Sequence, residues 1–154
     1  MLATYHPHRI ISGNKGLKQA RAALKAGSLV AFSTETVYGL GADATNDIAV
    51  ARIFEAKGRP HFNPLIIHLA SEGLANEIVA WNDAADQLAK AFWPGALTLV
   101  LPRLPECSVS LLASAGLDSL AVRVPNHDLA RTLLENAGCP IAAPSANKSG
   151  HISP

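Results

Sequence analysis

Short apolar segments that favour strands alternate along this chain with amphipathic segments that favour helices, and this alternation is the strongest constraint on the fold. In the first amphipathic segment, Leu17, Ala20 and Leu24 recur at helical spacing before Gly27 ends the helix. We expect helices over residues 16–26, 47–57, 71–79, 82–92 and 128–136. We expect strands over residues 28–32, 65–69, 97–101, 120–124 and 141–143, with residues 33–43 as a polar, glycine-containing connection. The pattern predicts an α/β fold with helices packed on a twisted, largely buried sheet.

Length and composition restrict the class of protein. The chain has 154 residues, 49% apolar and 16% charged, which fits one domain with a single core and excludes a mainly disordered chain. No apolar run approaches the roughly 18 residues that span a bilayer, and the opening residues show no secretory leader. Cys107 and Cys139 stand apart, so we expect reduced thiols. A cytoplasmic protein with no membrane partner is the resulting expectation.

Charge is distributed unevenly although the net charge is only +1. Residues 1–34 contain no acidic side chain, and the rest of the chain carries 8 basic against 12 acidic residues. The basic residues of the first segment are Arg9, Lys15, Lys18, Arg21 and Lys25. This segment is either a face that contacts a polyanion such as RNA or the solvated side of the first helix.

Polar residues gather where the expected strands and helices end, which is the usual place for a ligand crevice in an open α/β sheet. They are Thr34, Glu35, Thr36, Lys57, Arg59, His68, Thr98, Arg123, Ser145 and Asn147. We expect several of these groups to converge on one site.

Lys57 and Arg59 flank Gly58 at a helix end, and Pro60 prevents the helix from continuing. A planar guanidinium beside a mobile ammonium suits adjacent phosphates. The same residues would also serve as an ordinary cationic helix C-terminus.

Ser145 and Asn147 follow the last apolar strand and Pro144. In an extended segment these two side chains point to one side, where a hydroxyl and an amide could hold phosphate oxygens, a metal-bound water or backbone groups. Ordinary turn chemistry also favours such residues.

Two polar residues interrupt apolar strands. Arg123 should have a carboxylate or phosphate partner, which is either an acid of this chain or a ligand. His68 is either a hydrogen-bonded core residue or part of a site.

Several familiar motifs are missing from the sequence. Gly39 and Gly41 lack the third glycine of a dinucleotide fingerprint, and no P-loop lysine motif or nucleophile elbow occurs. The six histidines show no metal-ligand spacing, so no protein metal site is expected. Phosphate binding would need another scaffold.

The chain resembles the YrdC-like domain of threonylcarbamoyl-AMP synthases from about residue 9 onward. The resemblance rests on motifs that occur in the same order as in the family. They are Thr34-Glu35-Thr36-Val37-Tyr38-Gly39-Leu40-Gly41, Lys57-Gly58-Arg59-Pro60, Asn63-Pro64-Leu65, Trp93-Pro94-Gly95-Ala96-Leu97-Thr98, Val122-Arg123-Val124-Pro125 and Ser145-Ala146-Asn147.

This resemblance implies an enzyme that joins L-threonine, bicarbonate and ATP into threonylcarbamoyl-AMP and releases pyrophosphate. It implies a mixed sheet with flanking helices and a concave basic cavity, Mg²⁺ bound with ATP, and no organic cofactor. A transferase complex would then pass the threonylcarbamoyl group to tRNA. By the same resemblance, Lys57 and Arg59 are the expected catalytic cations, which stabilise charge on the phosphates.

Binding roles follow from the matching positions. The resemblance places ATP on Lys57, Arg59, Ser145 and Asn147. It places threonine on Thr34, Tyr38, His68, Thr98 and Arg123, with Arg123 holding the carboxylate.

Two departures from the family pattern stand out. Ser33 replaces a proline that commonly precedes the Thr-Glu-Thr motif, and the sequence stops at Pro154, soon after Ser145. We therefore expect residues 1–154 to be a single YrdC-like domain truncated at its C-terminal end.

Two other functions use the same features. A non-catalytic module for RNA or free nucleotide would use the cavity and the basic N-terminal segment, although eight Phe, Trp and Tyr residues are few for reading RNA. The related domain of hydrogenase maturation proteins handles carbamoyl-adenylate, but the zinc-finger and acylphosphatase-like regions that accompany it are not recognisable in this sequence.

Overall fold

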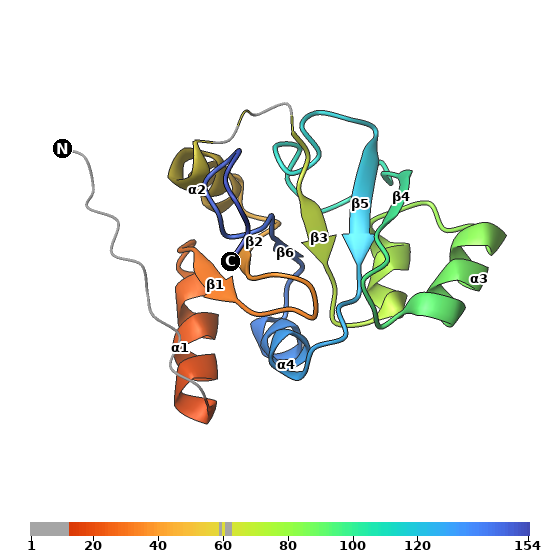
Figure 1. Ribbon diagram of the computed structural model, residues 1–154. Helices are drawn as coiled ribbons and strands as arrows, with labels where there is room; N and C mark the ends of the chain where they lie inside the picture. Colours follow the sequence, from red (N-terminus) through yellow and green to blue (C-terminus); the bar gives the residue numbers. More distant parts are fainter. Residues whose placement is uncertain (1–12, 59, 61–62) are drawn as a thin grey trace.

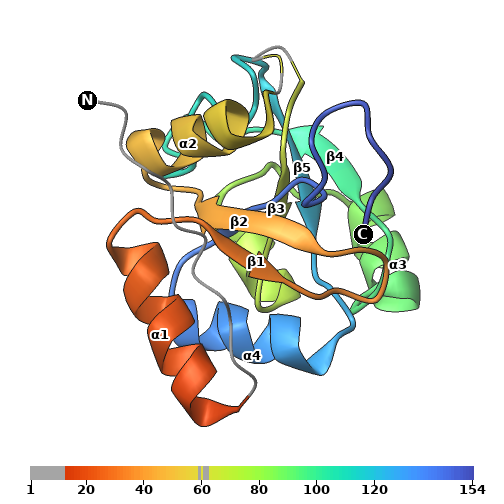
Figure 2. The same ribbon diagram turned by 60° about the vertical axis from the view of Figure 1, so that its left-hand side comes forward.

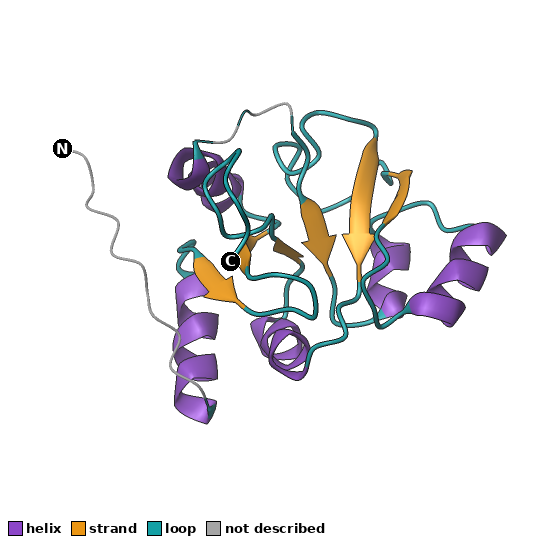
Figure 3. Ribbon diagram, in the orientation of Figure 1, coloured by secondary structure: helices purple, strands orange, loops and turns teal. Residues whose placement is uncertain are grey.

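The computed structural model describes residues 13–58, 60 and 63–154. The described part forms one mixed sheet with helices on both faces (Figures 1 and 3). In chain order the elements are α1 (Asn14–Lys25), β1 (Val30–Phe32), β2 (Gly39–Asp43), α2 (Asp47–Lys57), β3 (Ile66–His68), the 3₁₀ helix η1 (Glu72–Glu77), α3 (Asp83–Phe92), β4 (Leu99–Pro102), β5 (Ser119–Arg123), α4 (Asp128–Ala137) and β6 (Ile141–Ala142). The α/β prediction and the mixed sheet are confirmed.

The six strands lie in the order β1-β2-β6-β3-β5-β4. Only β3 and β5 are a parallel pair among the assigned strands, and the other neighbours are antiparallel. The register of the parallel pair aligns His68 with Arg123. These two polar residues, 55 positions apart in the sequence, therefore come to the same end of adjacent strands.

Hydrophobic clusters fill both faces of the sheet. Helix α2 covers one face, and α1 and α4 lie side by side on the other (Figure 2). Ile67 and Val122 belong to the cluster under α2. Because side chains alternate along a strand, His68 and Arg123 point to the opposite face.

Two parts of the predicted element pattern are wrong. Strand β2 lies within the stretch that we expected to be a connection, since its glycines mask the usual strand signal. A Cβ on Gly41 would lie 2.7 Å from the Ile141 side chain and 2.8 Å from the Phe32 ring, so this glycine lets the neighbouring strands pack closely.

The helix expected over residues 71–79 is instead the short 3₁₀ helix η1. The chain leaves the helix before Val79, because this residue forms an isolated antiparallel bridge with Arg103. Within the described ranges, no helix has the length and apolar character of a membrane span.

The end of α2 is fixed locally. The Asn46 side chain accepts a hydrogen bond from Ala49 N at 3.1 Å at the start of the helix, and Gly58 adopts the left-handed conformation at its end. This turn leaves the buried Lys57 as the last helical residue.

Candidate functional site

A small cleft is lined by residues of the β1–β2 connection, of β3 and β5, and of the segment after β6. Figure 1 shows how these elements are arranged. Its volume is about 70 Å³. The lining residues are Thr34, Thr36, Val37, Gly39, Ile66, His68, Arg123, Ala143, Pro144 and Ser145. The structure thus brings together Thr34, His68, Arg123 and Ser145, four of the predicted site residues.

Arg123 is the central charge of the cleft, with only 7% of its side chain exposed. Its Nη2 pairs with Glu35 Oε1 at 2.8 Å, and both Nη1 and Nη2 lie 3.3 Å from Thr36 Oγ1. Its Nε donates to Gly95 O at 3.1 Å. The expectation of an anionic partner is confirmed, and that partner is an acid of this chain.

The Glu35 carboxylate is held from two sides. Besides the Arg123 pair, Glu35 Oε1 accepts the backbone N–H of Asn126 at 3.0 Å. Burial raises the pKa of Glu35, but the hydrogen bonds from Asn126 and Arg123 outweigh it, and the pKa is lowered from the usual value. The ion pair is therefore fully formed at neutral pH.

His68 sits beside Arg123 as a neutral imidazole. Burial and the adjacent Arg123 charge lower its pKa to about 4. Its Nδ1 donates to Ile66 O at 3.2 Å, and its ring meets the edge of Phe32. The cleft thus contains one guanidinium charge and an uncharged imidazole.

The loop that closes the cleft is organised by Thr34. Its hydroxyl donates to Val37 O at 2.7 Å and accepts from Thr36 N at 3.2 Å and Val37 N at 3.3 Å. This is a turn built on a single side-chain hydroxyl. The Thr34 hydroxyl is already committed to the turn.

Lys57 lies beneath the segment that carries Ser145 and Asn147. Its side chain is 4% exposed, and Nζ donates to the backbone carbonyls of both residues. The Lys57 carbonyl in turn accepts the N–H of Ser149 at 3.1 Å. Lys57 therefore joins the end of α2 to residues 145–149.

Asn147 also has partners within this segment. Its Nδ2 donates to Lys148 O at 2.9 Å and His151 O at 2.8 Å, and its Oδ1 accepts the Ser153 hydroxyl at 3.1 Å. Its amide shapes the loop beside the cleft, whereas Ser145 reaches the lining.

The Trp-Pro-Gly motif supports Arg123 from outside the cleft. Trp93 Nε1 donates to Leu97 O at 2.7 Å, and Gly95 N donates to Val124 O at 2.8 Å. A Cβ on Gly95 would lie 2.1 Å from Phe92 O, so no other residue fits this turn. The sequence pattern did not indicate this positioning role or that of Thr36.

Two further predicted site residues, Tyr38 and Thr98, lie outside the cleft. Tyr38 is 52% exposed and Thr98 is half-buried, and neither lines this cleft. The backbone of Tyr38 still contacts the site, because its carbonyl accepts Ala146 N at 2.8 Å. Arg59 lies outside the described residues.

The described side chains include no cluster of three or more His, Cys, Asp or Glu residues that would hold a metal ion. Of the residues expected to hold ATP, Ser145 carries a hydroxyl, and Asn147 carries an amide oxygen that accepts the Ser153 hydroxyl. Mg²⁺ commonly keeps several waters and binds through substrate phosphates with few protein ligands, so a cation that arrives with a nucleotide would not need such a cluster.

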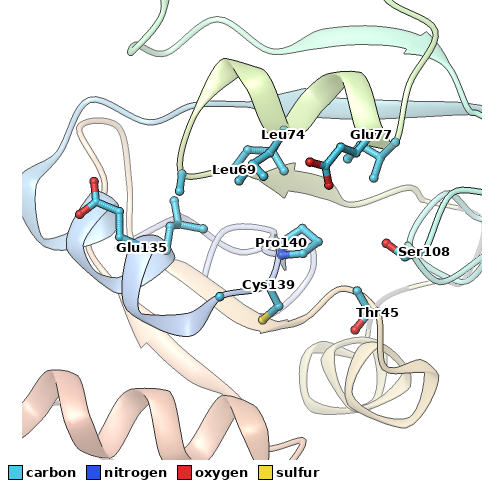
Figure 4. A pocket seen from close by; sticks show the side chains of 12 residues that line it. Thr45, Leu69, Leu74, Glu77, Ser108, Glu135, Cys139 and Pro140 are labelled. Carbon is cyan, nitrogen blue, oxygen red and sulfur yellow. The ribbon is translucent and has the colours of Figure 1, made fainter.

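A second, larger cavity lies between η1 and α4, with a volume of about 440 Å³ (Figure 4). It shares no lining residue with the cleft. Cys139 lines it, but burial and the neighbouring Asp43 raise the pKa of the thiol to about 12. This cysteine is therefore protonated at neutral pH and unsuited to act as a nucleophile.

Comparison with known proteins covers most of the chain. The Sua5/YciO/YrdC family model, which carries the description telomere recombination, matches residues 22–154. The chain belongs to this family. A threonylcarbamoyl-AMP synthase of Bacillus subtilis is 51% identical over 139 residues, and one of Pyrococcus abyssi is 55% identical over 142 residues. Each alignment spans 90% of this chain and 40% of the relative.

Solved structures agree with this membership. P. abyssi Sua5 in complex with L-threonine superposes with a TM-score of 0.89 at 50% identity, covering 94% of this chain and 42% of that protein. Full-length HypF in its phosphate- and nucleotide-bound form has a TM-score of 0.78 at 22% identity over 89% of this chain and 21% of that protein, which shows a shared fold.

Proposed function

We propose that this chain carries the substrate cleft of an L-threonylcarbamoyladenylate synthase, a nucleotidyltransferase. The observation that supports this most strongly is the cleft in which Thr34, His68, Arg123 and Ser145 meet. Relatives above 50% identity are named threonylcarbamoyl-AMP synthases, and one related structure was determined with L-threonine.

L-Threonine would bind with its carboxylate on Arg123, because a planar guanidinium presents paired N–H donors that match a carboxylate. The neutral His68 imidazole would form a hydrogen bond with the substrate without adding a second positive charge to the cleft. Thr34 would shape the wall of the cleft through its turn, and Tyr38 and Thr98 would complete the entrance.

ATP would bind beside residues 145–149 as its Mg²⁺ complex. Ser145 would contact the nucleotide directly, while Lys57 and Asn147 hold the loop in shape. Arg59, two residues beyond Lys57 in the sequence, would add charge toward the phosphates.

The reaction would proceed in two steps. The amino group of threonine first adds to bicarbonate with loss of water, giving a carbamate. A carbamate oxygen then attacks the α-phosphorus of ATP, and the bond to the bridging oxygen breaks as pyrophosphate leaves with the electron pair. Both reactants are anionic, so the cations of the site would lower their repulsion and stabilise the departing charge. No covalent enzyme intermediate is needed, because positioning and electrostatics supply the rate enhancement.

The product would supply a threonylcarbamoyl group to a tRNA-modifying transferase, so tRNA would be an indirect partner. The chain spans 40% of the length of its B. subtilis and P. abyssi relatives, so an assay of activity has to supply the remaining part of the protein. The assay therefore uses a chimera in which this chain replaces the matching segment of the B. subtilis relative, with the unaltered relative as positive control.

Pyrophosphate release by the chimera should require ATP, L-threonine, bicarbonate and Mg²⁺ together. Pyrophosphate release that does not depend on threonine would contradict the proposal. A folded chimera that releases no pyrophosphate while the unaltered relative is active would also contradict it. Nucleotide binding without release would favour the non-catalytic module.

A further inference from the structure

The ion pair between Glu35 and Arg123 occupies the group that the proposed substrate carboxylate needs. Arg123 directs Nε at Gly95 O and shares Nη1 and Nη2 with Thr36 Oγ1, while Nη2 also pairs with Glu35. A guanidinium edge accommodates one carboxylate in paired geometry. A substrate carboxylate that takes Nη1 and Nη2 together competes with Glu35 for Nη2.

We propose that Glu35 is an internal stand-in for the substrate carboxylate, so that the amino acid binds by displacing Glu35 from Arg123. This inference rests on the proposed function of the cleft. It makes Glu35 a residue that sets affinity and specificity for ligands carrying a carboxylate, although Glu35 does not itself line the cleft.

The surroundings of Glu35 permit such an exchange. Its carboxylate is held by Arg123 Nη2 and by the N–H of Asn126, and 22% of its side chain is exposed, against 7% for Arg123. The backbone turn of its loop is fixed by the Thr34 hydroxyl and not by the carboxylate. The side chain can therefore swing into solvent while the turn stays in place.

Burial of Arg123 explains why a stand-in is needed. A buried guanidinium left without an anion carries a large desolvation penalty, so the empty cleft is more stable with an internal carboxylate in place. Exchanging one carboxylate for another preserves the pairing of the buried charge. Substrate affinity then reflects the difference in free energy between the Arg123–substrate pair and the Arg123–Glu35 pair. It is weaker than the affinity that the Arg123–substrate pair would give without Glu35.

The same arrangement acts only on ligands that have a carboxylate. An amino-acid amide or alcohol cannot replace the charge of Glu35 on Arg123 and leaves the internal pair unbroken. Competition with Glu35 therefore lowers the affinity for the free amino acid and narrows its preference over the amide.

Glu35→Gln tests the exchange. Glutamine keeps an acceptor for Asn126 N–H but loses the charge, so L-threonine no longer competes with a carboxylate. We expect the Kd for L-threonine, measured by isothermal titration calorimetry, to fall about five- to tenfold. The Kd for L-threoninamide should stay within about twofold. Glu55→Gln, an exposed change on α2, is the matched control and should alter neither value.

Glu35→Ala is the second variant, in case glutamine makes a new bond to Arg123, and it should also tighten L-threonine binding. Unchanged or weaker binding in both folded variants would overturn the inference while leaving the proposed function intact. If the unaltered protein and both variants fail to bind L-threonine, the proposed function and the inference fall together.

Discussion

The ring of His68 stands edge-on to the ring of Phe32, with centroids 6.0 Å apart and an interplanar angle of 89°. Phe32 itself packs against Gly41, where a Cβ would lie 2.8 Å from the ring. A glycine on β2 therefore sets the position of an aromatic ring, which in turn forms a wall for a buried histidine of the cleft. Burial by this wall contributes to the unusual pKa of His68.

Acidification should destabilise the fold because of His68. Its pKa is lowered by burial and by Arg123 to about 4, below the usual 6.5, so the unfolded chain takes up a proton before the folded one does. Stability is retained above pH 6.5 and lost as the pH falls toward 4, by about 3 kcal/mol in all from this residue. Urea unfolding at pH 7, 6, 5 and 4.5 measures this slope.

His68→Gln should flatten the slope, whereas His151→Gln, on an exposed position near the end of the chain, should leave it unchanged. Glu35 acts in the same direction at lower pH, since its pKa is lowered and its ion pair is lost as the pH falls below 4.5. A slope between pH 6.5 and 5 that persists in His68→Gln would disprove the assignment.

Gly95→Ala should destabilise the protein by about 2–3 kcal/mol, because the new Cβ would meet the Phe92 carbonyl oxygen and force the backbone to shift. Since Gly95 O accepts a hydrogen bond from Arg123, the variant should also weaken L-threonine binding. Gly73→Ala is the control, because nothing lies within 4 Å of its Cβ position. It should change the free energy of unfolding by less than about 0.5 kcal/mol. Equal effects of the two changes would show that the turn tolerates a side chain.

Lys57→Met should lower stability by about 2 kcal/mol even without ATP, because methionine keeps the apolar stem but cannot donate to the carbonyls of Ser145 and Asn147. ATP affinity should fall as well, since the loop carrying Ser145 is no longer fixed. Lys25→Met, at the exposed end of α1, is the control and should alter neither quantity. A variant with unchanged unfolding but weaker ATP binding would assign Lys57 to the phosphates alone.

The basic face of α1 should be dispensable for catalysis. Its side chains are exposed, the helix packs against α4, and none of them lines the cleft. They are Lys15, Lys18, Arg21 and Lys25. Charge reversal of Lys18 and Arg21 to Glu should leave pyrophosphate release by the chimera nearly unchanged, and loss of release in a folded double variant would contradict this. If this face binds tRNA, removing a cation that pairs with a phosphate should reduce the slope of log affinity against log salt concentration by roughly 0.7–0.9.

Periodicity and helix signals were sufficient to predict most of the architecture. The helix expected over residues 128–136 is α4, and the strand expected over residues 120–124 overlaps β5 almost fully. These segments bury side chains at regular spacing, so sequence and structure agree. Strand β2 could not be predicted in this way because its packing depends on the absence of side chains, which no propensity scale rewards.

The site could be predicted only in part for a different reason. Residue types at element ends indicated that Thr34, His68, Arg123 and Ser145 would converge. The partners of charged groups depend on register and loop geometry, which the sequence does not specify. Only the folded structure shows that Arg123 pairs with Glu35 and that Lys57 binds backbone carbonyls of residues 88 and 90 positions away.

The most direct test of the claim that L-threonine binds in the cleft with its carboxylate on Arg123 is an NMR titration of the ¹⁵N-labelled chain with L-threonine. Backbone amide shifts should change at the cleft, at Val37, Gly39, His68 and Arg123, and L-threoninamide at the same concentration should cause much smaller changes there. Shifts confined to the second cavity, at Leu74, Glu135 and Cys139, or equal responses to the acid and the amide, would contradict the placement of the threonine carboxylate on Arg123.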